Sequence, residues 1–100
     1  MIVRLICYDI ENDNCRDKVA KKLEAWGYVR FQYSVFCGKH SPLQWQSLWT
    51  KIKAIIENYG SEKDKIYSIV LSSSNVKKMH CVGEPPDLDL ILDDIKTLWI

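Results

Sequence analysis

The chain has 100 residues, of which 47% are hydrophobic and 27% charged, with a formal net charge of +1. This size and composition are those of one folded domain and exclude a disordered chain. No apolar run approaches the roughly 20 residues needed to span a bilayer, and the first residues lack the layout of a signal peptide. We therefore expect a cytoplasmic protein that does not contact a membrane.

The four cysteines form no Cys-x-x-Cys pair, and neither histidine completes a zinc-binding spacing. We expect free, mostly buried thiols in a reducing compartment. The charge is unevenly distributed. Residues 84–100 hold five acidic residues and one lysine, a net charge of −4, so residues 1–83 carry +5. A basic body with an acidic tail is compatible with nucleic-acid contact, although a solvated surface with a polar tail explains it equally well.

The first half of the chain alternates strands and helices. Residues 2–9 read as a mostly apolar strand, and the Asp/Asn cluster after it is a helix-start signal. A helix follows from about Asp13 to Trp26, where Gly27 stops it. Residues 28–38, YVRFQYSVFCG, read as a strand because aromatic and β-branched residues dominate them.

The clearest helix covers residues 41–60. Ser41 is a good N-cap, Pro42 suits the first helical position, and Gly60 ends the pattern. Its apolar residues recur at helical spacing, and we interpret them as core. They are Trp45, Leu48, Trp49, Ile52, Ile55, Ile56 and Tyr59.

Two further strands are predicted at residues 64–73 and 76–83, followed by a Pro-Pro breaker at 84–87. Residues 88–100 fit either a strand or a short helix. The element order predicts an α+β sandwich with helices on one face of a largely antiparallel sheet, and the ferredoxin-like βαββαβ plan is the natural candidate. That plan needs two strands between the helices. Residues 28–40 offer no clean turn, so one long bent strand is the alternative.

Two groups of residues are candidates for chemistry. Asp9 ends the first strand, where a carboxylate could bind Mg²⁺ or simply cap the following turn. One carboxylate makes a poor site, but a two-fold dimer would bring two copies together. Arg30, Gln32 and Ser34 alternate along the third element and could contact phosphates, with Arg16 on the preceding helix. A plain solvent-facing surface is the alternative.

The sequence also resembles a known family. A strand ending in Tyr-Asp-Ile, a helix with Arg and Lys, and then Gly–aromatic–x–Arg–x–Gln–x–Ser–Val–Phe resemble the small CRISPR-associated protein that accompanies the spacer integrase, the second of the two core adaptation proteins. The resemblance covers about residues 1–83. The matching positions are Tyr8, Asp9, Ile10, Arg16, Gly27, Tyr28, Arg30, Gln32, Ser34, Val35 and Phe36.

This resemblance implies a ferredoxin-like domain at residues 1–83 and an extension at 84–100 that contributes to dimer or partner contacts. It implies a homodimer whose C-terminal strand crosses to the partner's sheet. Asp9 would be the catalytic and metal-binding residue, with Mg²⁺ between the two copies. Tyr8, Gln32, Ser34 and Phe36 would support this site. Cys37 stands where many relatives carry an acidic residue, which predicts a weaker nuclease if that acid helps the metal or the dimer.

Two functions follow as hypotheses. One is a metal-dependent endoribonuclease acting on single-stranded RNA. The other is a scaffold in CRISPR spacer acquisition, which holds duplex DNA between integrase dimers through a basic stripe. A stand-alone, toxin-like ribonuclease of the VapD kind is a more distant alternative. The residues predicted to contact nucleic acid are Arg16, Lys18, Lys21, Lys22, Arg30, Lys77 and Lys78.

Overall fold

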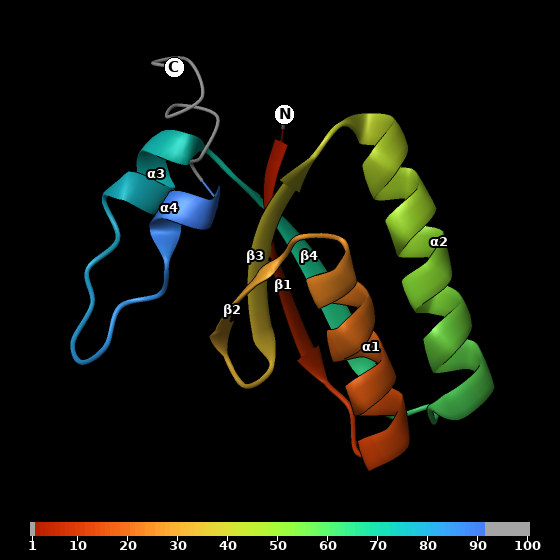
Figure 1. The fold of residues 1–100 in the computed structure, drawn as a ribbon. Helices are drawn as coiled ribbons and strands as arrows, with labels where there is room; N and C mark the ends of the chain where they lie inside the picture. Colours follow the sequence, from red (N-terminus) through yellow and green to blue (C-terminus); the bar gives the residue numbers. More distant parts are fainter. Residues whose placement is uncertain (1, 92–100) are drawn as a thin grey trace.

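The computed structural model describes residues 2–91, in which two long helices cover one face of a four-stranded sheet (Figure 1). The strand order is β2-β3-β1-β4, and every neighbouring pair is antiparallel. This is the ferredoxin-like βαββαβ plan, so the predicted α+β class is confirmed. The elements are β1 (Ile2–Asp9), α1 (Asp13–Ala25), β2 (Val29–Gln32), β3 (Val35–His40), α2 (Pro42–Tyr59), β4 (Lys65–Leu71), α3 (Ser73–Lys77) and α4 (Leu88–Ile91).

Both long helices begin and end where the sequence predicts. The side chain of Asn12 caps α1 by accepting the backbone N–H of Cys15 at 2.9 Å. Ser41 and Gln44 form a reciprocal capping box at the start of α2. Gly27, after α1, has φ +88°, a left-handed conformation that side-chain-bearing residues rarely adopt.

Residues 28–40 form the two strands that the ferredoxin-like plan needs, so the alternative of one long bent strand is wrong. Tyr33 and Ser34 make the turn between β2 and β3 without Gly, Pro or Asn. The turn is fixed from outside: the backbone N–H of Tyr8 in β1 donates to the Ser34 carbonyl at 3.1 Å, and the Tyr8 hydroxyl donates to the Tyr33 carbonyl at 3.3 Å. Tertiary contacts therefore supply the turn signal that the local sequence lacks.

The segment after β4 also differs from expectation. The strand predicted at residues 76–83 is replaced by α3, whose N-cap Ser72 accepts the Asn75 N–H at 3.0 Å, and by irregular chain. Among the described residues the sheet therefore gains no extra strand after β4. Residues 88–91 form the short helix α4, and the rest of the predicted C-terminal element lies outside the described residues.

Each face of the sheet has its own core. The helical face buries the larger cluster, which includes Ile6, Phe36, Leu23 and Leu48, all with 0% exposure. Burying each such side chain contributes roughly 1.5–3 kcal/mol. On the opposite face α3 and α4 cover a smaller cluster of Val3, Cys37, Val76 and Ile91 (Figure 1). The predicted boundary at residue 83, between the ferredoxin-like domain and the C-terminal extension, stays a prediction. Ile91 of the predicted extension packs in the same cluster as Val3 of the predicted domain. No helix within residues 2–91 is long and apolar enough to cross a membrane.

Candidate active site and nucleic-acid interface

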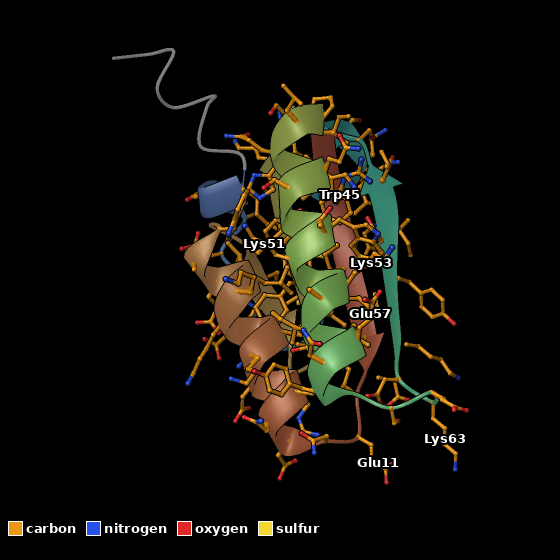
Figure 2. The ribbon with its side chains drawn as sticks, turned by 90° about the vertical axis from the view of Figure 1, so that its right-hand side faces the viewer. Glu11, Trp45, Lys51, Lys53, Glu57 and Lys63 are labelled. Carbon is orange, nitrogen blue, oxygen red and sulfur yellow. The ribbon has the colours of Figure 1, made fainter. Side chains whose placement is uncertain are left out.

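Asp9 is the last residue of β1 and is exposed. Its Cα partner in the sheet is Lys65, the first residue of β4. It lines an open depression at the end of the sheet, together with Glu11 and residues 62–65, and Figure 2 shows Glu11 and Lys63 at this end of the molecule. No side chain within residues 2–91 forms a hydrogen bond or ion pair with the Asp9 carboxylate. Its oxygens are therefore available to a ligand.

Asp9 alone supplies one carboxylate, and the described residues contain no cluster of three side chains able to hold a metal ion. Mg²⁺ binds through one or two carboxylates and keeps several waters. An exposed carboxylate with no side-chain partner in the described part of the chain fits one half of such a site. In the predicted two-fold dimer, Asp9 of another copy of the chain would supply the second half.

Asp64 lies in the same depression, but its carboxylate already accepts hydrogen bonds from the backbone. Its carboxylate accepts the Ser61 N–H at 2.8 Å and the Glu11 N–H at 3.2 Å. These backbone hydrogen bonds hold the pKa of Asp64 below its ordinary value, with Ser61 making the largest contribution. Asp64 therefore ties the loop that follows Asp9 to the loop that precedes β4.

A second group gathers at the β2–β3 turn around Tyr33, which is 64% exposed. The guanidinium carbon of Arg16 lies 5.6 Å from the centre of the Tyr33 ring, and that of Arg30 lies 5.5 Å from it. Both distances fall in the range of cation–π attraction. Arg30 also lies 4.9 Å from the Phe36 ring and forms a 3.9 Å ion pair with Glu24. The two predicted arginines thus meet at one exposed aromatic residue.

Arg16 is anchored from two further directions. It forms an ion pair with Asp13 and donates a hydrogen bond to the Ile10 carbonyl at 3.1 Å. The pKa of Arg16 is raised, by Asp13 first and then by the Tyr33 hydroxyl, so the guanidinium stays charged. Arg16 is therefore fixed to the residue that directly follows Asp9 in the chain. Neither Arg16 nor Arg30 lines the depression at Asp9.

Tyr8 links this group to the sheet. It is 6% exposed, and its ring stacks on Phe36 with the ring centres 6.1 Å apart. Burial raises the pKa of Tyr8, and the neighbouring Arg30 opposes this effect. Tyr8 is therefore a neutral hydrogen-bond donor that holds the turn carrying Tyr33. The predicted supporting residues Tyr8 and Phe36 do lie together with Arg16 and Arg30.

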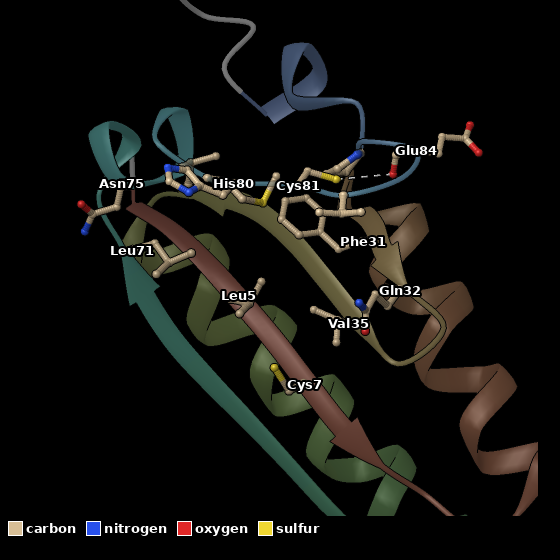
Figure 3. Close-up of a pocket in the computed structure, with 14 residues that line it drawn as sticks. Leu5, Cys7, Phe31, Gln32, Val35, Leu71, Asn75, His80, Cys81 and Glu84 are labelled. Carbon is tan, nitrogen blue, oxygen red and sulfur yellow. Dashed lines mark hydrogen bonds between the residues drawn. The ribbon is translucent and has the colours of Figure 1, made fainter.

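Gln32 and Ser34 do not share a face with Arg30, so the predicted polar face is wrong. The β2–β3 register shifts between Arg30 and Gln32, which breaks the alternation of side chains along β2. Arg30 pairs with Phe36 on the helical face. Gln32 pairs with Val35 and lines a cavity on the opposite face, beside Val35 (Figure 3). Ser34 lies in the turn.

The predicted basic stripe is also divided. Lys18, Lys21 and Lys22 of α1 line a groove against α2 on the helical face. Lys77 and Lys78 lie at the end of α3, which packs on the opposite face of the sheet (Figure 1). The sequence places them in one list of cations, but the sheet separates them into two surfaces.

Cys37 has no part in the Asp9 depression. It is 0% exposed, and burial raises the pKa of its thiol to about 11, so the thiol is neutral. Its Cα partner is Leu5, four residues before Asp9 and hence about 13 Å away along an extended strand. A side chain at position 37 therefore cannot join Asp9 of the same protomer at one ion.

Sequence reasoning missed three residues of these sites. The sequence places Tyr33 inside a predicted strand and Asp64 at the polar start of another. It also predicts Tyr59 to be a core residue, although Tyr59 is 48% exposed in the structure. Once the two-residue turn is known, the aromatic side chain of Tyr33 in that turn is the local feature that indicates an exposed ring. Tyr59 is the last residue of α2, where helical periodicity no longer guarantees burial.

Comparisons with known proteins agree with this architecture. A family model described as CRISPR associated protein Cas2 matches residues 1–79. CRISPR-associated endoribonuclease Cas2 3 of Synechocystis sp. is 36% identical over 86 residues, which cover 86% of this chain and 89% of the relative. CRISPR-associated endoribonuclease Cas2 of Aeropyrum pernix is 32% identical over 83 residues, which cover 83% of this chain and 87% of the relative.

Solved structures give the same result. A chain from a partial Cas6-RT-Cas1–Cas2 complex superposes with a TM-score of 0.71 and 33% identity, covering 85% of this chain and 90% of that one. Streptococcus pyogenes Cas2 has a TM-score of 0.67 at 22% identity, covers 81% of this chain and 99% of that one, and supports the fold alone. From the match over residues 1–79 and these relatives, the chain belongs to the CRISPR-associated Cas2 family.

Proposed function

We propose that this chain is a homodimeric Cas2 protein of CRISPR spacer acquisition, which holds duplex DNA together with the spacer integrase in the cytoplasm. We further propose that it is a Mg²⁺-dependent endoribonuclease for single-stranded RNA. The observation that carries the enzymatic proposal is the exposed carboxylate of Asp9 at the end of β1, which has no side-chain partner among residues 2–91. The scaffold proposal is supported by similarity to a chain from a complex that contains Cas1.

The exposed edge of the sheet supports the proposed dimer. β4 is an edge strand in the described chain, and three of its apolar side chains are exposed: Tyr67 by 60%, Ile69 by 48% and Val70 by 60%. An edge with free backbone groups and apolar side chains is a template for strand addition. A C-terminal segment from a second copy would cover these side chains and complete the sheet.

In the proposed reaction, Asp9 of each protomer would hold one Mg²⁺, which would supply Lewis-acid stabilisation of the charge that develops on the phosphate. The chain's own residues do the positioning. Arg16 and Arg30 bind the phosphate backbone as charged donors. Tyr33 lies against both guanidiniums, and Tyr8 holds the Tyr33 carbonyl.

The test of the nuclease is cleavage of labelled single-stranded RNA and duplex DNA by wild type and Asp9→Ala, with Mg²⁺ and with EDTA. Asp17→Ala is the matched control, since Asp17 is an exposed carboxylate on α1. We expect Mg²⁺-dependent cutting that Asp9→Ala abolishes and Asp17→Ala retains. Cutting that persists in Asp9→Ala or in EDTA would refute the assignment of Asp9.

The scaffold is tested separately by binding. Affinity for duplex DNA should fall as salt rises, should not depend on sequence, and should survive Asp9→Ala. Purified integrase should join the complex in size-exclusion chromatography. An affinity that stays flat between low and moderate salt would refute the scaffold.

A further inference from the structure

The helical face carries a groove between α1 and α2 that the proposed nuclease does not use. It lies between the two long helices, which Figure 2 shows side by side, and it shares no lining residue with the depression at Asp9. None of the described residues that line it is acidic. They are Lys18, Lys21, Lys22, Ala25, Ile55 and Tyr59.

The three lysines of this groove are spaced so that they share one face of α1. Residues three and four apart on a helix are neighbours, so Lys18 faces both Lys21 and Lys22. No carboxylate within residues 2–91 forms an ion pair with any of them. Three neighbouring, unpaired cations repel one another, and an anion placed between them would relieve that repulsion. The positive charge of the groove therefore favours binding of a negatively charged ligand.

Tyr59 adds an aromatic surface to the same groove. It is 48% exposed, and the ammonium nitrogen of Lys18 lies 4.7 Å from the centre of its ring. Lys18 thus contacts the Tyr59 ring and also belongs to the group of three lysines, so the ring and the lysines form one continuous surface. Ala25 and Ile55 supply apolar surface between them. Cations that follow a phosphate backbone, combined with an aromatic ring for a base, characterise binding of single-stranded nucleic acid.

We propose that the α1–α2 groove is a binding site for single-stranded nucleic acid, in which the three lysines contact phosphates and one unpaired base stacks on Tyr59. The proposal rests on the proposed function for the nature of the ligand but concerns a site distinct from Asp9. A duplex would satisfy the lysines but not Tyr59, because its bases are already stacked and paired. The site therefore discriminates in favour of single strands.

The chain offers a matched pair of variants. Lys21→Gln/Lys22→Gln removes two adjacent lysines from the groove. Lys77→Gln/Lys78→Gln removes two adjacent lysines that the sequence also predicts to contact nucleic acid but that lie on the opposite face, outside the groove. Binding is measured by fluorescence anisotropy of a labelled uridine oligonucleotide from low to moderate salt. Each phosphate contact contributes about 0.7 to the slope of log affinity against log salt for single strands, so the groove variant should lose about 1.4. The α3 variant should lose much less.

Tyr59→Ala and Tyr59→Phe test the stacking. Stacking of one base contributes roughly 1–3 kcal/mol, so Tyr59→Ala should weaken binding of the uridine oligonucleotide by about 5- to 150-fold. Tyr59→Phe keeps the ring and should bind like wild type. Binding to duplex DNA of equal length should change little in either variant. Because Tyr59 ends α2 and the lysines are on the surface, thermal unfolding should confirm that all variants remain folded.

Either of two results would overturn the proposal: equal loss of salt slope in the two lysine variants, or equal weakening of single strand and duplex by Tyr59→Ala. Failure of the nuclease proposal would look different, because cutting would then persist in Asp9→Ala or in EDTA while binding to this groove stayed intact. Absence of duplex binding with intact uridine binding would refute the scaffold and keep the groove.

Discussion

Tyr33 offers the sharpest test of how this chain orients its arginines. Its ring centre lies 5.6 Å from the guanidinium carbon of Arg16 and 5.5 Å from that of Arg30. A cation–π contact at an exposed site contributes about 0.5–1 kcal/mol, so the two together contribute about 1–2 kcal/mol. If a phosphate is bound in the geometry seen here, Tyr33→Ala should reduce the binding free energy by about 1–2 kcal/mol. Without the Tyr33 ring, the side chains of Arg16 and Arg30 must be ordered when the phosphate binds.

The expected result is an affinity for single-stranded RNA, and a cleavage rate at limiting enzyme, that fall by about 5- to 30-fold in Tyr33→Ala. Tyr33→Phe keeps the ring and should stay within about threefold of wild type by the same scale. The assay combines anisotropy with single-turnover cleavage. Tyr33 is 64% exposed, so urea unfolding should detect a loss of stability no larger than the roughly 1–2 kcal/mol of the two cation–π contacts. Tyr33→Ala behaving like wild type, or Tyr33→Phe behaving like Tyr33→Ala, would refute the reasoning.

Three further predictions concern the framework of the site. In Gly38→Ala the new Cβ would lie 2.6–2.8 Å from three atoms of the Tyr28 ring, so urea denaturation should show a loss of about 1–3 kcal/mol, and adding Tyr28→Leu should recover part of it. Burial lowers the pKa of His40, so the unfolded chain binds a proton at a higher pH than the folded chain does, and the free energy of unfolding should decline as the pH falls below about 6.5. His40→Phe should flatten this pH dependence in thermal melts. An unchanged pH dependence in that variant would show that another group causes it. Asp64 has a lowered pKa, so its contribution to stability is present at neutral pH and is lost as the pH falls from about 3.8 through its folded pKa; Asp64→Asn should speed hydrogen exchange at the Glu11 and Ser61 amides, and unchanged exchange would contradict the tether.

The sequence itself determined the elements whose signals are local. Both long helices were predictable because an N-cap, a periodic apolar face and a terminal glycine all lie within one stretch of chain. β1 was predictable from its apolar run, and Asp9 from its position at the end of that strand. The order of elements then left few topologies, and the ferredoxin-like plan was among them.

Other features depend on partners that lie far away in the sequence, and they follow from tertiary contacts. The turn at Tyr33 and Ser34 contains no Gly, Pro, Asn or Asp and is held by Tyr8 from another strand. The register shift between Arg30 and Gln32 arises from pairing with β3, and it moved Gln32 to the other face of the sheet. Such contacts join residues far apart in the sequence, so no local pattern encodes them.

The same distinction explains the charges. Composition shows that the body of the chain is basic, but not that Lys21 and Lys77 lie on opposite faces of a sheet. Nor can spacing show that Arg16 and Arg30 meet at Tyr33, because their convergence requires α1 to pack across β2 and β3. Local propensity and periodicity fix which elements form, whereas packing and strand pairing fix which side chains share a surface.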